Sequence, residues 1–366
     1  MWKWLLADTH GTPQVELTTA TSRQVSWNYR AAASATFHLP GDAHEGDANE
    51  ALYANELISD VLVYHDQNLV FRGRVGAVDE TLEVDKHDLT VSVVDYRTML
   101  SRRFTATTDT AYSNVDPGDV AWALIHDAQA WPGGNLGITR GAAQHTGRIY
   151  GWTVPASKPI DEAITDALAV FPGGSGEWWI DPQLRLQVPP QRGADKGERL
   201  IWGTNVTKLD RKWNPDEFAN VIVSTGKTGD STTPGPPTQV VEASDVATRP
   251  EGRIAKTVSN TDLTTAQQVL EAGQFALGYS GNITPAWTVT LSEWGGFSHI
   301  DVGDLVWLVV KSGRLDVNQQ LRVTQIDVSL DDNDDETVQV TLGGQKEWLG
   351  ALLKQMPRQL AQLART

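Results

Sequence analysis

The 366-residue chain contains no cysteine, which excludes disulfide bonds, thiolate zinc sites and cysteine nucleophiles. Long hydrophobic runs are missing as well, because no stretch approaches the roughly 18 consecutive apolar residues of a membrane-spanning helix. The N-terminal run Met1–Leu6 is too short for the apolar region of a secretory signal and has no small-residue cleavage site behind it. We therefore expect a protein made and kept in a cytoplasm, or one that leaves it by lysis or inside a larger particle.

Positive charge is scarce in this sequence. Asp and Glu number 46 against 30 Lys and Arg, so the net charge is −16 at pH 7. Proteins that bind nucleic acids neutralise phosphates with cations, whereas the negative net charge of this chain repels phosphates. Two interpretations stay open: the acid excess keeps the protein in solution, or it lines a wall past which DNA slides without sticking.

Catalytic and metal-binding motifs are also missing. The eight histidines show no metal-ligand spacing, and there is neither a G-x-S-x-G elbow nor a phosphate-binding loop. The acidic run Asp331–Glu336 could attract calcium, but it lacks the spacing of a known calcium loop and lies between two predicted strands, so a solvated hairpin tip is favoured. Glu177, beside Trp178 and Trp179, is the best-placed acid for glycoside hydrolysis, although a lone acid at a strand start is usually structural. We expect no catalytic residue, no metal and no cofactor.

Tryptophan, in contrast, is abundant, with 14 residues scattered along the whole chain. Exposed aromatic platforms are typical of sugar-binding surfaces, whereas core and interface packing uses tryptophan at least as often. The scatter favours packing, and a glycan-binding or receptor-binding protein remains the alternative.

Residues in the first hundred positions alternate with a period of two, which predicts β-strands. The runs are Gln24–Tyr29, Ser34–Leu39, Asp60–Tyr64, Leu69–Val75 and Asp88–Asp95. The third and fourth flank a four-residue polar loop, His65–Asn68, and predict a hairpin. Sheet edges in such a pattern need pairing or closing, so a small barrel or sandwich is expected.

The middle of the chain changes to a mixed α/β pattern. Asp116 and Pro117 have the features of a helix start, and a second helix is predicted from about Pro159. Glu177–Val188 then predicts a hairpin that turns at Asp181. Further strands follow from Val206, with a Gly- and Pro-rich loop at 226–237 and a helix at about Leu263–Leu277. Strands return at 286–291 and continue to Leu342.

The last segment is predicted to be an amphipathic helix over 345–366, split or kinked at Pro357. Its apolar residues are candidates for a contact with a partner or with another copy of the chain, or for packing on their own domain. The residues proposed for this interface are Trp348, Leu349, Leu352, Leu353 and Met356.

The whole pattern predicts a mainly β protein with α+β insertions. The expected division is a first β-barrel domain at 1–104, an α/β domain at 105–200, a second β-barrel domain at 201–225 and 285–344, an inserted helix-containing domain at 226–284, and the terminal helix at 345–366.

Four stretches, in this order, carry a family resemblance: Asp60–Val75, Val91–Leu100, Asn220–Ser224 and His299–Val306. The first ends in an F-x-G-x-V run, the second contains a loose form of a D-Y-x-x-L-L corner, and the last contains a V-G-D-x-V turn. The chain resembles the tail hub proteins of long-tailed phages, which are also called minor tail proteins or baseplate hubs. The resemblance covers nearly the whole chain as an order of elements, although each motif alone is weakly specific.

The resemblance implies a homotrimer in which each subunit contributes two tube-like β-barrels, so that three chains form a pseudo-sixfold ring below the hexameric tail tube. It implies a non-enzymatic structural protein of the virion tail tip, assembled in the host bacterial cytoplasm. Implied partners are the distal tail or tail tube protein, the tape measure protein and tail fibre or tip proteins, with DNA only as cargo passing through during ejection. Relatives with a C-terminal hydrolase extend beyond this point, so a lysin is not expected.

Overall fold

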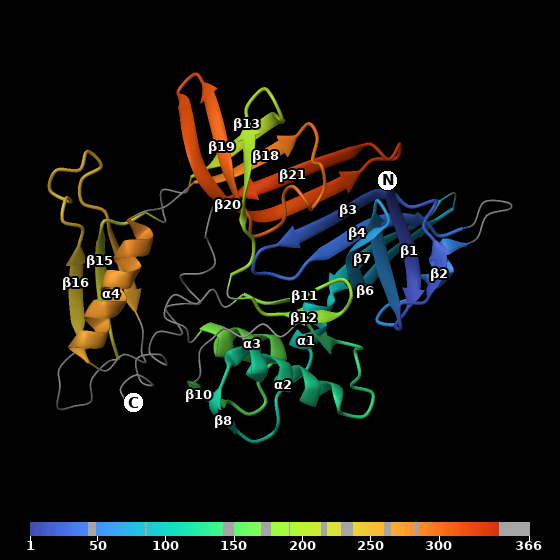
Figure 1. The fold of residues 1–366 in the computed structure, drawn as a ribbon, viewed down its shortest axis with the longest axis horizontal. Coiled ribbons are helices and arrows are strands. Elements are labelled where there is room, and N and C mark those ends of the chain that lie inside the picture. Colours follow the sequence, from blue (N-terminus) through green and yellow to red (C-terminus); the bar gives the residue numbers. More distant parts are fainter. Residues whose placement is uncertain are drawn as a thin grey trace. The chain divides into compact units, whose positions relative to one another are not determined.

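The computed structural model describes residues 1–42, 49–84, 86–141, 150–169, 177–189, 191–213, 218–227, 237–259, 265–281 and 285–343. The chain divides into two compact units, the first built from Met1–Leu209 with Thr288–Leu342 and the second around Asp210–Trp287. Strands dominate the described residues, with four α-helices among them (Figure 1). The predicted mainly β fold class is therefore confirmed.

A sheet of 13 strands forms the largest part of the fold. Its N-terminal strands are β1 (Trp2–Asp8), β2 (Pro13–Glu16), β3 (Thr21–Asn28), β4 (Ser34–Pro40), β5 (Ser59–His65), β6 (Asn68–Glu83) and β7 (Lys86–Asp95). Its C-terminal strands are β13 (Asp195–Ile201), β14 (Val206–Lys212), β18 (Ala286–Leu291), β19 (Leu305–Ser312), β20 (Leu315–Leu330) and β21 (Glu336–Leu342). A short 3-10 helix, η1 (Glu50–Tyr53), precedes β5.

The two β-rich halves of the chain are joined in this one sheet. β20 pairs antiparallel with β3, so that Ile326 lies opposite Trp27 and Val328 opposite Val25. The strand order is β14-β18-β21-β20-β3-β4-β7-β6-β5-β1-β2, with β19 on β20 and β13 on β19. Because this order among the described strands runs from β14 to β2 without a closing pair, the two predicted barrels are not confirmed as separate closed units.

The hairpin predicted at β5 and β6 is present, but its turn is shorter than expected. His65 pairs directly with Asn68, which leaves a loop of Asp66 and Gln67 alone. Both loop residues have positive φ, 47° and 69°, as two-residue hairpins of the mirror-image turn type require. The twist of the flanking strands favours this tight turn over the four-residue loop that polarity predicted.

The middle region contains small sheets together with the two helices predicted from Asp116 and from about Pro159. Its elements are α1 (Tyr96–Ser101), β8 (Thr110–Val115), α2 (Pro117–Gln129), β9 (Thr139–Arg140), β10 (Tyr150–Val154), α3 (Ile160–Ala169), β11 (Trp179–Ile180) and β12 (Arg185–Gln187). Asp116 caps α2 by accepting a hydrogen bond from the Gly118 amide at 2.8 Å. The apolar faces of α2 and α3 share one core, which includes Ile125, Ile164 and Trp178.

The second unit contains a three-stranded sheet and one helix. β15 (Val221–Thr225) lies between β16 (Thr238–Glu242), which runs antiparallel, and β17 (Ala255–Ser259), which runs parallel. α4 (Ala266–Ser280) packs on β15 and β16. The helix is close to its predicted place, and Leu263, from which it was expected to start, lies outside the described residues.

The predicted C-terminal helix at 345–366, with its proposed interface residues Trp348, Leu349, Leu352, Leu353 and Met356, also lies outside the described residues. Among the residues that the structure does describe, no helix is both long and apolar enough to cross a membrane.

Candidate functional site

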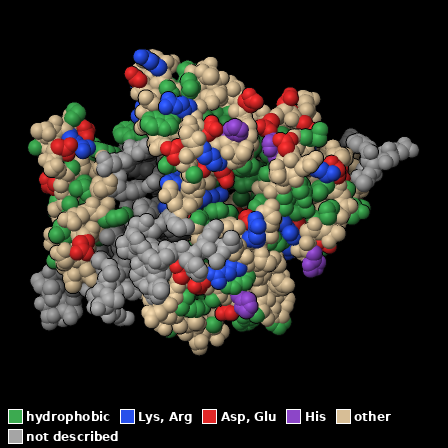
Figure 2. All heavy atoms as spheres, viewed as in Figure 1, with side chains coloured by type: hydrophobic (Ala, Val, Ile, Leu, Met, Phe, Trp, Pro, Cys, Tyr) green, Lys and Arg blue, Asp and Glu red, His purple; other side chains and the backbone are tan. Residues whose placement is uncertain are grey.

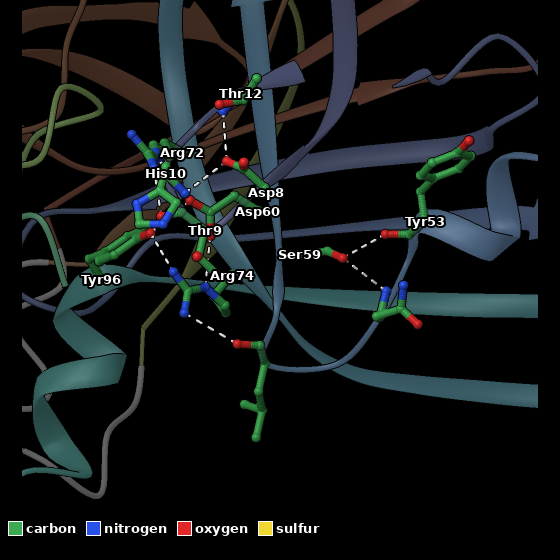
Figure 3. Close-up of polar contacts among 12 residues, drawn as sticks. Asp8, Thr9, His10, Thr12, Tyr53, Ser59, Asp60, Arg72, Arg74 and Tyr96 are labelled. Atoms are coloured by element: carbon green, nitrogen blue, oxygen red, sulfur yellow. Dashed lines mark hydrogen bonds and ion pairs between the residues drawn. The ribbon is translucent and has the colours of Figure 1, made fainter. Parts of the chain in front are cut away.

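The F-x-G-x-V run and the Asp-Tyr corner meet in a buried ion network (Figure 3). Asp60 on β5 has no exposed surface and accepts hydrogen bonds from two arginines of β6. Arg72 donates from Nε and Nη2 to Oδ2 at 2.9 and 2.8 Å, and Arg74 donates from Nε to Oδ1 at 2.7 Å. The hydroxyl of Tyr96, the first residue of α1, donates to the same Oδ2 at 2.7 Å. The network therefore ties β5, β6 and α1 together.

Gly73, the glycine of the F-x-G-x-V run, lies at a position where no larger residue fits. Side chains alternate along a strand, so Arg72 and Arg74 point to one face while Phe71, Gly73 and Val75 point to the other. A Cβ atom on Gly73 would lie 2.6 Å from the Val94 carbonyl oxygen and 2.7 Å from the Phe71 ring. Only glycine fits there, so the strand face opposite the two arginines is closely packed.

The Asp95–Tyr96 pair has two distinct tasks. Asp95 caps α1 by accepting from the Thr98 amide at 3.1 Å, and it also accepts from the Ala33 amide at 2.7 Å. Burial raises the pKa of Asp95 and raises the pKa of Tyr96 to about 12. Tyr96 is therefore a neutral hydrogen-bond donor at physiological pH.

The remaining donors of the two arginines are largely satisfied by oxygen atoms. Arg74 donates to the Tyr96 hydroxyl at 2.8 Å and to the Leu57 carbonyl at 3.2 Å, and Arg72 reaches the Thr9 carbonyl at 3.4 Å. Asp8 shapes the turn that presents Thr9, since its Oδ1 accepts from two amides of that turn. Buried charges are stable only when they are paired and hydrogen-bonded, and this cluster meets that condition.

The V-G-D-x-V turn forms a second buried network. Asp304 is only 2% exposed; its Oδ1 accepts from the Ala194 amide at 2.8 Å, and Lys196 lies 2.8 Å from its Oδ2. Gly303 and Gly193 make the close approach possible: a Cβ on Gly193 would lie 2.0 Å from the Gly303 carbonyl carbon. The motif thus fastens the start of β13 to the loop that leads into β19.

Arg322 on β20 extends this second network. Its Nη1 donates to the carbonyls of Gly303 at 2.7 Å and Arg192 at 3.0 Å, and its guanidinium lies 5.2 Å from the Tyr29 ring centre. Arg192 in turn donates to the Asn28 carbonyl at 3.2 Å. The middle region, β3 and β20 therefore share one set of polar contacts.

Glu177, the acid that the sequence singled out for hydrolysis, lies in this second network. It is 3% exposed, its Oε2 accepts from the Arg192 amide at 2.5 Å, and Arg30 lies 3.5 Å from its Oε1. Burial raises its pKa to about 7. Its neighbours Trp178 and Trp179 are stacked against Arg97 and Arg192, each at 4.4 Å. This geometry suits a structural clamp, because both carboxylate oxygens have protein partners and little surface is open to a substrate.

A cavity of about 310 Å³ lies beside the two networks. Its walls include the aromatic residues Trp27, Phe71, Trp179 and Phe297 and the charged residues Arg72, Asp95, Arg192 and Asp301. Burial raises the pKa of Asp301. Aromatic walls with a few charged groups are typical of small-molecule sites, so this cavity is a candidate ligand site.

The acidic run forms the hairpin tip that was predicted. Asp331 Oδ1 accepts from the amides of Asn333 and Asp335 at 2.8 and 2.9 Å, which closes the turn between β20 and β21. Asp334 forms an ion pair with Arg23. In the described part of the chain, no three His or acidic side chains gather closely enough to hold a metal ion.

Packing uses many of the described tryptophans. Trp4, Trp27, Trp178, Trp287 and Trp294 are buried, and Trp294 packs edge-on against Phe297 with ring centres 4.6 Å apart. The tryptophans exposed by more than a third are Trp131, Trp202 and Trp213. Packing therefore accounts for much of the unusual tryptophan content.

Comparison with solved structures identifies this fold. No protein-family model and no curated protein matches the sequence. The 43 kDa tail protein of prophage MuSo2 from Shewanella oneidensis superposes with a TM-score of 0.65 at 15% identity, covering 93% of this chain and 98% of that one. A tail protein from Neisseria meningitidis MC58 gives 0.62 at 14% identity, with 95% and 98% covered.

A third structure widens the comparison. The E. coli c3393 protein is a type VI secretion component described as similar to the T4 bacteriophage tail proteins gp27 and gp5. It gives a TM-score of 0.50 at 9% identity, covering 93% of this chain and 77% of that one. The chain thus has the fold of phage tail proteins and of their baseplate-hub relatives, and the resemblance predicted from the four sequence stretches is confirmed at the level of fold.

Proposed function

We propose that this chain is a non-enzymatic structural hub of a phage tail tip. The observation that carries the proposal is the extent of the fold match, since nearly all of this chain matches nearly all of a tail protein. The two buried networks support it, because they fasten the sheet, α1 and the middle region of the first unit into a stiff body. A stiff body of this kind suits an adaptor that transmits position along a tail.

In this proposal three copies form a pseudo-sixfold ring. The strands of β1–β7 and those of β13, β14 and β18–β21 are the two β-rich halves that each copy would contribute as tube-like barrels. A duplicated subunit solves the mismatch between threefold and sixfold symmetry. The domain boundaries given above belong to the same proposal, as does a partner contact through Trp348, Leu349, Leu352, Leu353 and Met356.

The ring would surround a channel for the tape measure protein and then for DNA. It would join the distal tail or tail tube protein above to fibre or tip proteins below, and it would be assembled in the host cytoplasm before release in the virion. The net charge of −16 is consistent with a wall that does not bind DNA. On the face seen in Figure 2, acidic and basic side chains are interspersed, so the acid excess is spread out there.

Light scattering of the purified protein tests the hub proposal. The expected mass is three times the 40.0 kDa of one chain, with no change on addition of a metal chelator. A species that stays at the mass of one chain, alone and when mixed with its tail tube and distal tail proteins, would contradict it.

Glycan or receptor recognition on the virion is the second candidate, and the cavity of about 310 Å³ favours it. A glycan screen should then give hits that Trp179→Ala removes. A cell-wall hydrolase is less favoured, because Glu177 is buried and bound. Only a hydrolase activity that is lost in Glu177→Gln would support this alternative.

A further inference from the structure

The β6–β7 hairpin extends beyond the end of β5 and leaves one edge of β6 without a paired strand among the described residues. β5 pairs with β6 only as far as Arg74, and the Leu57 amide then donates to the Val75 carbonyl at 2.8 Å. From Ala77 to Glu83, β6 pairs with β7 on one side, and no described strand pairs with its other side. Backbone groups on such an edge can pair with a strand of another molecule.

The tip of this hairpin also exposes apolar side chains. Leu82 is 75% exposed and Val84 is 101% exposed, the largest values of any Leu or Val in the described residues. Asp79, Glu80 and Glu83 on the same strand are exposed acids. The edge therefore combines apolar surface that would gain from burial with negative charge that selects a basic partner.

A basic strand edge of the same length exists in this chain. β14 is the terminal strand in the sheet order, and among the described strands of that order it pairs with β18 alone. Its Lys208, Arg211 and Lys212 are exposed, and Leu209 lies between them with partial exposure. Six strands separate β14 from β6 in the order of the sheet, so a second copy of the chain is the natural source of the matching edge.

We propose that β6 of one copy pairs antiparallel with β14 of the next, with Leu82 opposite Leu209. In that register Glu83 faces Lys208 and Asp79 faces Lys212. Glu80, which also pairs with His87 at 2.6 Å, faces Arg211, whose guanidinium lies 5.4 Å from the Trp287 ring centre. Directly opposed side chains on paired strands are close enough for charge pairs and apolar pairs to stabilise the contact. Parallel pairing over the same residues would place Leu82 against Arg211, which is why the antiparallel register is favoured.

The contact joins two different surfaces, so each copy offers β6 on one side and β14 on the other. Heterologous contacts of this kind form closed rings when the rotation between copies closes. The inference rests on the proposed hub function and adds to it the strands through which the ring is built. Two chains of net charge −16 repel each other, so the local pairs of opposite charge would set the register against this repulsion.

The cysteine-free chain allows a direct test by cross-linking. Two singly substituted proteins, Leu82→Cys and Leu209→Cys, are mixed at high concentration and treated with a short thiol-specific cross-linker. Only contact between copies can join the two different variants. We expect a covalent dimer from the mixture, and a closed trimer from the double variant Leu82→Cys/Leu209→Cys. Leu52→Cys mixed with Leu209→Cys is the matched control, since Leu52 is 70% exposed but lies outside the proposed edge.

Charge reversal tests the register. Glu83→Lys in the Leu82→Cys protein should lower the cross-linked yield about fivefold or more by opposing two cations, and Lys208→Glu in its partner should restore it. A yield equal to the Leu52 control, or a loss without restoration, would overturn the proposed pairing. If the wild type is trimeric by light scattering and the cross-link is still absent, the hub function stands and only this interface is wrong. If the wild type fails the light-scattering test, the hub function fails with it.

Discussion

Asp60 and Tyr96 lie 36 residues apart in the chain, and the Tyr96 hydroxyl donates to the Asp60 carboxylate at 2.7 Å where neither residue is more than 1% exposed. The contact joins the strand that starts the β5–β6 hairpin to the helix that follows β7. It explains why an aspartate, two arginines around a glycine, and an Asp-Tyr pair occur together in the sequence.

Removing the Asp60 carboxylate should strongly destabilise the protein. Asp60→Ala leaves Arg72 and Arg74 without their buried counter-charge, and breaking a buried ion pair from one side costs about 3–5 kcal/mol. Urea unfolding followed by tryptophan fluorescence measures the loss. Asp316→Ala removes an exposed acid of β20 in the same sheet and should change the free energy of unfolding by less than about 0.5 kcal/mol. Equal effects of the two substitutions would show that the Asp60 network does not hold the fold together.

The glycine contact at the V-G-D turn has an internal control. Gly193 and Gly197 both have positive φ, 81° and 74°, but a Cβ would collide with Gly303 at the first position and meets nothing within 4 Å at the second. Gly197→Ala should cost about 1 kcal/mol from the backbone conformation alone. Gly193→Ala should cost a further 1–3 kcal/mol, roughly, from overpacking. Thermal or urea unfolding compares them, and an equal loss would mean that the close contact does not matter.

The raised pKa of Glu177 makes the free energy of unfolding depend on pH. Burial raises its pKa from 4.5 to about 7, so the folded state binds a proton that the unfolded state releases between these values. The free energy of unfolding should therefore fall as the pH rises through this window, and no contribution is expected below it, where both states are protonated. Glu177→Gln should flatten this part of the profile while keeping the hydrogen bond from the Arg192 amide.

The control for that profile is Glu56→Gln, which removes an exposed acid outside the proposed contact between copies. Asp95, which is buried, and Asp301, which is half-buried, also have raised pKa values and act in the same direction, so the test is the difference between wild type and variant. A profile for Glu177→Gln that is parallel to the wild type would contradict the assignment.

Local pattern was enough to predict much of the fold. The alternation around Asp60–Val75 gave the hairpin, and the capping pair at Asp116 and Pro117 gave the start of α2. These features depend on neighbouring residues in the chain. The length of β20 was not predicted, because its first part, Leu315–Gln320, is polar and pairs with β19 instead of packing in the core.

The candidate site could be predicted only as separate motifs. Sequence indicated Gly73, Asp95–Tyr96 and Gly303–Asp304, but the partners that explain them come from distant segments: Asp60 for Tyr96 and Ala194 for Asp304. Glu177 illustrates the limit most clearly. Its position beside two tryptophans suggested a catalytic acid, and only the fold places the Arg192 amide on its carboxylate.

Electron microscopy of the purified protein in negative stain, with class averages of single particles, tests the central claim most directly. The hub account predicts rings with threefold symmetry, six similar lobes and a central hole, because each chain would contribute two β-rich halves. Compact particles of one chain without a hole, at concentrations up to those used for cross-linking and in the presence of the tail tube protein, would contradict it.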